Sequence, residues 1–464
     1  MRNDNGNILI MSIIIAALLI ATAFAYFAVG SSERYEASYE EATMQAYFLA
    51  EQGIIEKGIG YLRTRRPSDL PTGTVYLPPK TEPGVGQYLR THISKVSAFS
   101  GNDVFSNTNF YDIYSTGRVT FGLANRHEVE RTKKLRVKLR SYSNYLYLTQ
   151  TEETVYDEVI WFWGPGRDTL TGRVHSNDWI GMRGRPVFLG PISTCKPDFI
   201  HGEGYNPDFR VEPEFNVPPI EFPEYAQNIR ANARPFIDDQ NGRLMTRIGA
   251  DGEAIHIWQY LMGQPFDPDN VISYRTIATP AWGSIFVNGQ MELYGTVAGR
   301  CTFGSAENMW LIDNIKCAST NDVNGVGDNG TYDVIGLISE KNIIIKDNYQ
   351  NGRDNSSSGN SIIINAAVVA LNQSFTFEHQ NDDWDAYQGP TPDERGTIYL
   401  WGSVAQQRRG YVHRSNHGGT GYNKSYVYDR RLDNQPPPHF VDAVDEQGFG
   451  LFDLIFWEEL KPEK

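Results

Sequence analysis

An uninterrupted apolar segment near the N-terminus constrains this chain more than any other feature. The 22 residues from Ile8 to Val29 contain no charged side chain. As an α-helix, a segment of this length extends about 33 Å, which matches the hydrocarbon thickness of a lipid bilayer. The sequence therefore predicts a transmembrane helix over residues 8–29.

Two alternatives for this segment remain open. A cleaved secretory signal peptide would account for the small-x-small sequence at residues 23–25, but its apolar run is usually only about 7–15 residues and follows a positively charged start. Here the run is longer, and Asp4 offsets Arg2. A plain membrane anchor is the other alternative.

The helical pattern continues beyond the apolar segment. No proline occurs before Pro67, and apolar residues recur at three- and four-residue steps from Tyr35 to Leu62. One continuous helix over residues 7–64 is therefore expected, about 80 Å long between Ile8 and Leu62. Half of this helix would lie in lipid and the other half outside it.

A motif in the outer half of the helix carries a family resemblance. Residues 45–56 read Gln-Ala-Tyr-Phe-Leu-Ala-Glu-Gln-Gly-Ile-Ile-Glu, and the motif residues are Ala46, Tyr47, Phe48, Leu49, Ala50, Glu51 and Gly53. Together with a short polar start ending in Gly6 and an apolar span beginning at Asn7, this run resembles the type IV pilins and type II secretion pseudopilins, especially their minor members. The resemblance implies that a prepilin peptidase removes residues 1–6 as a leader peptide and leaves Asn7 as the mature N-terminus.

The same resemblance implies partners and a location. Other pilins or pseudopilins would bind through the N-terminal helix, which would cross the cytoplasmic (inner) membrane once and place the bulk of the chain in the periplasm or outside the cell. Major pilins, however, carry a glutamate five residues into the mature chain, where this chain has Met11. Because a carboxylate in lipid is costly unless it is paired, its absence removes a docking group and argues against regular incorporation into a filament shaft.

Composition limits the remaining possibilities. A chain of 464 residues with 40% hydrophobic and 12% aromatic content can form two or three domains. Its formal net charge of −14 argues against a general nucleic-acid binder, so no nucleic-acid partner is expected. The basic run at residues 131–140 alternates with period two, which predicts a strand with a solvated basic face; contact with DNA or anionic lipid is the alternative.

Two β-rich regions follow the helix. Alternating runs broken by Ser-Gly and Gly-Asn signals predict an antiparallel sheet over residues 65–150, packed on the outer half of the helix. From residue 151 to 435, short β-branched runs punctuated by Gly, Asn or Asp predict a β-solenoid domain, with a β-sandwich as the alternative. Prolines interrupt the pattern in an irregular insertion over about 205–280, with a short helix near residues 225–233, and residues 436–464 would form a C-terminal tail. The predicted fold class is α+β.

Three candidate sites accompany this architecture. The sequence His-Ser-Asn-Asp at residues 175–178, with His201 and Glu203 downstream, could form a catalytic constellation, although a backbone turn explains the same residues. Cys301 and Cys317 could form a disulfide that contributes roughly 3 kcal/mol, or could be core residues. A glycine-rich loop offers the weak calcium ligands Asp322, Asn324 and Asp328, but a solvated loop is the favoured interpretation.

The sequence as a whole predicts a non-enzymatic minor pilin-like or pseudopilin-like protein, located at a filament tip or sparsely incorporated, that needs no cofactor. Its β-rich domain would prime assembly or bind a surface glycan or a secreted substrate. A membrane-tethered adhesin outside any filament and a glycan-active β-helix enzyme are the alternatives.

Overall fold

The chain folds as two compact units of the α+β class. The first unit comprises residues 1–139 and 452–464, and the second comprises residues 140–451. The structure is a computed structural model, which describes residues 5–96, 109–122, 126–153, 158–328, 330–351, 361–378, 393–414 and 420–460.

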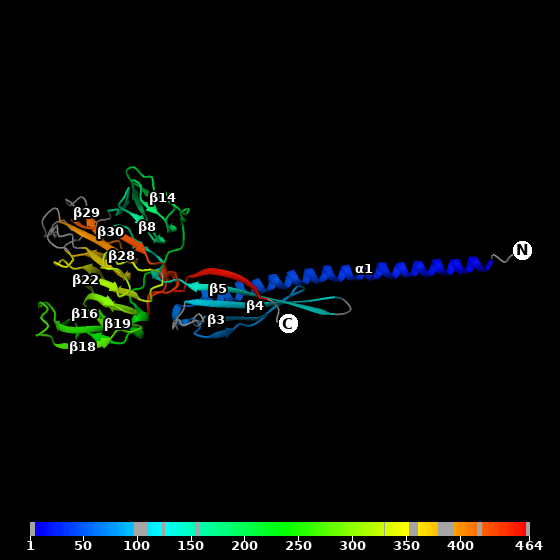
Figure 1. Ribbon diagram of the computed structural model, residues 1–464, viewed down its shortest axis with the longest axis horizontal. Coiled ribbons are helices and arrows are strands. Elements are labelled where there is room, and N and C mark those ends of the chain that lie inside the picture. The colour runs from blue at the N-terminus through cyan, green and yellow to red at the C-terminus, as the bar shows by residue number, and fades with distance from the viewer. Residues whose placement is uncertain are drawn as a thin grey trace. The chain divides into compact units, whose positions relative to one another are not determined.

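The first unit begins with one long helix. It consists of α1 (Asn5–Gly53), the π-helical segment η1 (Ile54–Ile59) and α2 (Gly60–Arg63). These segments follow one another without a break, so the chain has the single long N-terminal helix that was predicted, here extending from Asn5 to Arg63. The 56 residues from Ile8 to Arg63 include an apolar stretch that is not buried in the protein, and the helix is long and apolar enough to cross a membrane (Figure 1).

An antiparallel sheet completes the first unit. The strand order is β1-β3-β4-β5-β31, and β2 pairs with β3. The strands are β1 (Thr74–Tyr76), β2 (Lys80–Glu82), β3 (Gly86–Lys95), β4 (Phe110–Phe121), β5 (His127–Leu139) and β31 (Phe452–Leu460), and a 3₁₀ turn, η2 (Pro67–Asp69), precedes them. An antiparallel sheet after the helix was predicted, but its extent differs: the first unit's part of this region ends at Leu139, and residues 140–150 belong to the second unit.

The prediction of a C-terminal tail over residues 436–464 is wrong for residues 452–460, which form strand β31. Strand β31 pairs antiparallel with β5, which places Trp457 opposite Leu135 and Glu459 opposite Lys133. The apolar run Leu454 to Trp457 thus completes a sheet whose other strands lie more than 300 residues earlier in the chain. Residues 436–451 belong to the second unit.

The outer half of the helix packs on this sheet in two hydrophobic clusters. In one, Ala42, Ala46 and Leu49 are buried with side chains of β3, β4 and β5. In the other, Ile54 and Leu62 are buried with a larger group from the same strands: Ile93, Tyr111, Ile113, Leu135, Val137 and Leu139. Strands β3, β4 and β5 accordingly lie beside the C-terminal part of α1 (Figure 1).

The basic run at residues 131–140 forms most of strand β5, as predicted, but its basic face is not solvated. Lys134 and Arg136 both pair with Asp112 of β4, at 3.2 and 2.6 Å, and Lys138 lies 3.7 Å from Asp453 of β31. Charge pairs between neighbouring strands stabilise a sheet. Because these three cations are already paired with carboxylates of the protein, they are less available to a nucleic acid or an anionic lipid. The alternating pattern therefore indicated the strand correctly and its exposure incorrectly.

The second unit is built on two ladders of parallel strands, and successive strands alternate between them. The first ladder runs β15 (Phe236–Asp238), β19 (Trp282–Asn288), β21 (Arg300–Ser305), β23 (Val334–Ser339), β26 (Ala367–Ala370), β28 (Asp393–Arg408), β6 (Tyr147–Thr151), β9 (Val174–Ser176) and β12 (Ile192–Thr194). The second begins with β16 (Leu244–Gly252), β20 (Met291–Val297) and β22 (Met309–Cys317). Strand β22 pairs with both β24 (Ile343–Ile345) and β25 (Ile362–Ile364). Strand β24 then pairs with β27 (Phe375–Phe377), while β25 pairs with β28, which pairs in turn with β30 (Thr420–Tyr428).

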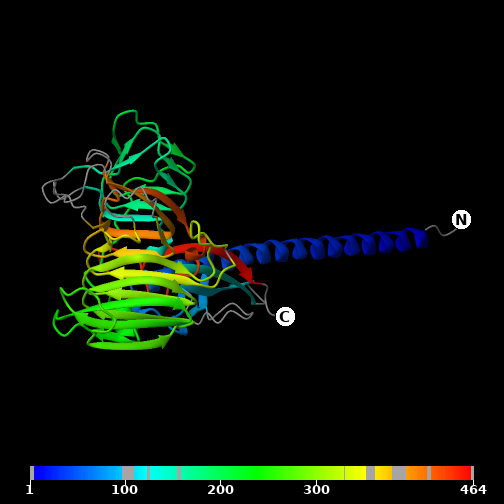
Figure 2. The ribbon, with the colours of Figure 1, turned by 60° about the vertical axis from the view of Figure 1, so that its left-hand side comes forward.

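The register of the first ladder stacks apolar side chains in one column. The buried residues Ile285, Phe303, Leu337, Val368, Val404, Tyr147, Val174 and Ile192 occupy equivalent positions on eight consecutive strands. Figure 2 shows these strands as stacked ribbons, from green through yellow and orange to cyan. Each strand covers its neighbour's apolar side, and this parallel pairing contradicts the β-sandwich alternative, which requires antiparallel sheets.

Shorter elements border the ladders. Two three-stranded parallel sheets contain β7 (Trp161–Trp163), β10 (Gly181–Arg183) and β13 (Ile200–His201), and β8 (Thr169–Leu170), β11 (Val187–Phe188) and β14 (Asp208–Phe209). The strands β17 (Ala254–Leu261), β18 (Ser273–Ala278) and β29 (His413–Arg414) pair antiparallel with their neighbours. The helical turns are α3 (Gln227–Asn232), η3 (Tyr142–Asn144) and η6 (Arg430–Asp433).

The predicted irregular insertion over residues 205–280 is only partly correct. The short helix is present as α3, but strands β15 to β18 occupy much of residues 236–278. Strand β16 is a regular member of the second ladder, paired in parallel with β20. The sequence pattern obscured these strands because β18 is exposed along most of its length and so has no apolar alternation.

Candidate functional site

The motif that carries the family resemblance lies where the helix meets the sheet. Ala46 and Ala50 are fully buried, and Gly117 of β4 faces them. A Cβ atom at Gly117 would lie 2.0 Å from the Ala46 carbonyl oxygen and 2.7 Å from the Ala50 backbone nitrogen. The small motif residues and Gly117 thus allow the helix backbone to lie directly against β4.

The glycine of the motif, Gly53, also allows the helix to lie close to the sheet. Gly53 is buried, and a Cβ atom there would lie 2.2 Å from the Ser115 hydroxyl oxygen and 3.1 Å from that of Thr91. Those two hydroxyls are hydrogen-bonded to each other across strands β3 and β4 at 2.9 Å. A side chain at position 53 would therefore disturb both the helix and the strand pair beneath it.

The polar motif residues clamp the helix to β5. The Lys133 ammonium lies 3.0 Å from a Glu51 carboxylate oxygen and 3.8 Å from the centre of the Tyr47 ring. Burial alone would lower the pKa of Lys133, but its contacts with Tyr47 and Glu51 raise the pKa above its usual value, so the lysine stays charged. The motif residues Leu49 and Phe48 differ sharply: Leu49 is buried, whereas Phe48 is 59% exposed.

The predicted processing residues lie at the beginning of the helix. Gly6 and Asn7 belong to the first turns of α1, which starts at Asn5. Residues 1–4 lie outside the described part of the chain.

The sequence His-Ser-Asn-Asp at residues 175–178, the candidate for a catalytic constellation, lies in a buried hydrogen-bonded network. His175 Nδ1 lies 2.9 Å from the Ser193 hydroxyl, and Nε2 lies 2.9 Å from the Asn177 carbonyl oxygen, so the neutral ring is held by one acceptor and one donor. Burial lowers the pKa of His175 to about 4. Asn177 in turn binds both backbone groups of Ile220, at 2.7 and 3.0 Å. His175 therefore links β9 to Ser193 of β12 and positions the Asn177 side chain, which holds the segment around residue 220.

The proposed downstream partners of His175 lie elsewhere. His201 is exposed and stacks on Tyr205, with ring centres 3.8 Å apart, and its Nε2 lies 3.6 Å from Asp198. Glu203 accepts a backbone hydrogen bond from Gly184 through its carbonyl oxygen. The turn interpretation of residues 175–178 agrees with this arrangement, since the Ser176 hydroxyl accepts from the Asp178 backbone N–H at 3.1 Å.

Of the two alternatives for Cys301 and Cys317, the structure shows core residues and no disulfide. Cys301 and Cys317 are buried free thiols on strands of different ladders, β21 and β22. Burial raises the pKa of both thiols, that of Cys317 to about 12, so both behave as core residues.

The candidate calcium ligands are engaged in local contacts. Asp322 forms an ion pair with Lys316, the Asn324 side chain accepts from Val326 N–H at 3.2 Å, and the Asp328 side chain accepts from Gly330 N–H at 2.8 Å. Among the residues that the structure describes, no group of three or more His, Cys, Asp or Glu side chains is placed to hold a metal ion.

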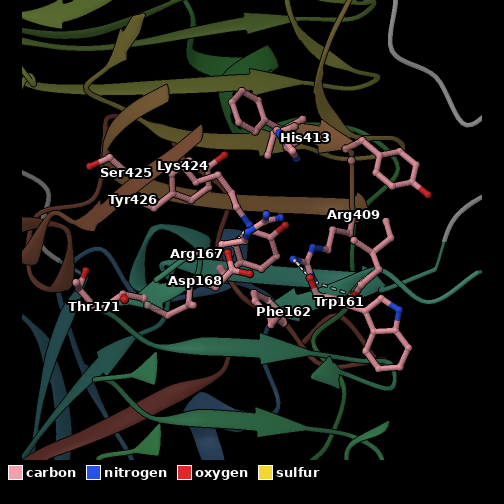
Figure 3. A pocket seen from close by; sticks show the side chains of 18 of the residues that line it. Trp161, Phe162, Arg167, Asp168, Thr171, Arg409, His413, Lys424, Ser425 and Tyr426 are labelled. Atoms are coloured by element: carbon pink, nitrogen blue, oxygen red, sulfur yellow. Dashed lines mark hydrogen bonds and ion pairs between the residues drawn. The ribbon is translucent and has the colours of Figure 1, made fainter. Parts of the chain in front are cut away.

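The second unit contains a polar pocket that the sequence did not reveal. Its volume is about 310 Å³, and its walls come from β6, β7, β8, the end of β28, β29 and β30. Charged residues at its surface are Arg167, Asp168, Arg409 and Lys424, and aromatic residues include Tyr147, Trp161, Phe162 and Tyr426. Figure 3 shows Arg167, Asp168 and Lys424 together in the middle of the pocket, with Arg409 and Trp161 to one side.

Ion pairs organise the cations of the pocket. Arg409 donates to Glu152 at 2.8 Å and lies over the Phe162 ring at 3.8 Å, while Lys424 pairs with Asp168. Asp168 also accepts from the Trp163 backbone N–H at 2.7 Å. Burial tends to raise the pKa of Asp168, but Lys424 and Arg409 lower it below its ordinary value, so the carboxylate stays ionised.

Sequence reasoning could not have found this pocket. Asp168 precedes Arg409 and Lys424 by more than 200 residues, and no regular spacing in the sequence connects the three. Arg409 follows the end of β28, whereas Lys424 lies on β30. The only signal was indirect: a cluster of aromatic residues at 161–163 next to Arg167 and Asp168, and the pair Arg408-Arg409 before a glycine. Strand stacking brings these segments together.

Comparison with known proteins does not assign a family. No protein-family model and no curated protein sequence matches the chain. Among solved structures, the competence-associated pilin ComZ from Thermus thermophilus is similar at 9% sequence identity, over 90% of this chain and 98% of that one, with a TM-score of 0.29. A TM-score that low does not establish a common fold.

Proposed function

We propose that this chain is a minor pilin-like or pseudopilin-like component of a type IV pilus or type II secretion filament. The observation that carries the proposal is the helix: its apolar half is entirely exposed, and its other half is buried on an antiparallel sheet through the motif Ala46 to Gly53. A helix that is apolar all round needs lipid or other helices around it. Membrane insertion followed by helix-to-helix assembly satisfies that need.

The solvent side of the outer helix supports contact with neighbouring subunits. Met44, Phe48 and Ile55 are 60%, 59% and 50% exposed on a segment that would ordinarily present polar side chains to water. The proposed partners are therefore other pilins or pseudopilins and the cytoplasmic membrane. Removal of residues 1–6, with Asn7 as the mature N-terminus, is part of the proposal.

The second unit is proposed to be a β-solenoid without enzymatic activity, presented outside the membrane for assembly priming or for binding a surface or secreted molecule. Its alternating parallel ladders and stacked apolar column support this assignment. Two features support tip location or sparse incorporation as part of the proposal: the Met11 position and the bulk of a second unit spanning residues 140–451. A shaft made only of such subunits would crowd these domains.

Filament incorporation is tested by shearing surface filaments from cells that express the tagged chain. We expect the native chain in the sheared fraction at low stoichiometry, with immunogold label at filament ends or at scattered points. Gly6→Val should keep the chain in the membrane, whereas Gly73→Ala, at a glycine outside the helix whose Cβ would meet nothing within 4 Å, should leave incorporation unchanged. Dense labelling along the shaft would contradict tip location. Surface display that is unaffected by Gly6→Val or by deletion of the assembly ATPase would favour the tethered adhesin instead.

A further inference from the structure

The pocket of the second unit combines an excess of positive charge with aromatic walls. Three cations, Arg167, Arg409 and Lys424, accompany the carboxylates of Asp168 and Glu152, in a chain whose overall charge is −14. Two of the cations are neutralised within the protein, since Arg409 pairs with Glu152 and Lys424 with Asp168. The charge of Arg167 remains.

Arg167 is placed differently from the other two. Its side chain is exposed and lies over the Trp163 ring at 4.9 Å, and in the described part of the chain no carboxylate forms an ion pair with it. A guanidinium presents paired N–H donors that match a carboxylate in two parallel hydrogen bonds. The pocket thus offers one cation for which the described residues supply no carboxylate partner.

The remaining lining suits a sugar ring. Trp161, Tyr147 and Tyr426 supply aromatic surface, and Thr171 and Ser425 supply hydroxyl groups. Burial raises the pKa of Tyr147 and Tyr426, so both phenols keep their protons and can donate hydrogen bonds. A volume of about 310 Å³ lies at the small end of ligand pockets, which are about 300–1,000 Å³.

We propose that this pocket binds a carboxylate-bearing sugar residue of an acidic polysaccharide. Arg167 takes the carboxylate, the aromatic walls stack against the apolar faces of the ring, and the threonine, serine and tyrosine hydroxyls bind its hydroxyl groups. Asp168 holds the Lys424 ammonium in position, and Glu152 does the same for Arg409, so neither carboxylate opposes the ligand as a bare charge. The inference rests on the proposed function, whose second unit is presented for binding, and names the class of molecule bound.

Binding is tested by calorimetry with the full chain in detergent micelles. The probes are a panel of oligogalacturonate, oligomannuronate, oligoguluronate and sialylated oligosaccharides, each with its carboxyl-reduced neutral counterpart. We expect saturable binding of at least one acidic member and at least tenfold weaker binding of its reduced counterpart. Arg167→Gln should weaken the acidic ligand about tenfold or more, the usual effect of removing a hydrogen bond to a charged group. The control Arg275→Gln, at an exposed arginine of β18 that does not line the pocket, should have no effect.

The proposal is overturned if no acidic oligosaccharide binds, if the reduced counterparts bind equally well, or if Arg167→Gln weakens binding no more than Arg275→Gln does. Displacement of the sugar by inorganic phosphate or a DNA oligonucleotide at lower concentration would also overturn it, in favour of a phosphate ligand. Thermal unfolding of each variant shows whether it is folded. These outcomes are independent of filament incorporation, so failure here leaves the proposed function standing, and failure of incorporation leaves the ligand measurable.

Discussion

Replacing Gly117 by alanine tests how closely the helix lies on the sheet. The new Cβ atom would approach two backbone atoms of α1, the Ala46 oxygen at 2.0 Å and the Ala50 nitrogen at 2.7 Å. Backbone cannot rotate away as a flexible side chain can, so the helix must move outward by an ångström or more. Overpacking of this kind costs typically about 1–3 kcal/mol, and two backbone contacts place the expected cost at about 2–3 kcal/mol.

Amide hydrogen exchange of the full chain in detergent measures this loss where it occurs. Peptides from β3, β4 and β5 should exchange roughly 30- to 150-fold faster in Gly117→Ala, since each 1.4 kcal/mol of opening free energy is about a factor of ten. Gly73→Ala is the matched control, because its Cβ would meet nothing within 4 Å. That variant should be neutral or stabilised by about 0.4–1 kcal/mol. Equal exchange in the two variants would refute the packing of α1 on β4.

Three further predictions address other contacts. Lys133→Met should destabilise the first unit by about 1–2 kcal/mol, seen as faster exchange in β5, because the ion pair with Glu51 is lost. The free energy of unfolding of the second unit should fall by about 1.4 kcal/mol per pH unit as the pH falls from 6.5 towards 4, because His175 is protonated in the unfolded chain but stays neutral in the folded chain until about pH 4. In urea titrations, His175→Gln should flatten this dependence, whereas His201→Gln should leave it unchanged. Arg409→Met should cost about 3–5 kcal/mol in the same titrations by leaving the Glu152 carboxylate buried and unpaired, and adding Glu152→Gln should restore much of that loss.

Local sequence patterns predicted the elements that depend on nearby residues. The uncharged run and the absence of proline before Pro67 predicted the helix, and period-two alternation predicted β5. The small motif residues Ala46, Ala50 and Gly53 also acquire a physical explanation, because they lie against Gly117 and Ser115 rather than only matching a family pattern.

Pairings between distant segments could not be predicted from the sequence. Strand β31 pairs with β5 although the whole second unit lies between them in the sequence, and Asp453 of β31 forms an ion pair with Lys138 of β5. The same limitation concealed the pocket, because its cations reach their carboxylate partners only when β28 and β30 stack against residues near the start of the second unit. Side-chain alternation reports which face of a strand is polar, but not whether a neighbouring strand supplies the opposite charge.

Cysteine and histidine patterns left alternatives open for the same reason. The spacing of Cys301 and Cys317 permits a loop-closing bridge, yet parallel stacking places them on different ladders as core residues. His175 lies in a polar tetrapeptide, but burial and two hydrogen bonds keep its ring neutral and structural.

The central claim is that the apolar N-terminal segment remains in the mature protein as a membrane helix whose outer half packs on the sheet of the first unit. Intact-mass analysis of the chain extracted from membranes tests it most directly. We expect a single species that begins at Asn7, found in the membrane or filament fraction. A soluble species that begins near Tyr26 would contradict the account.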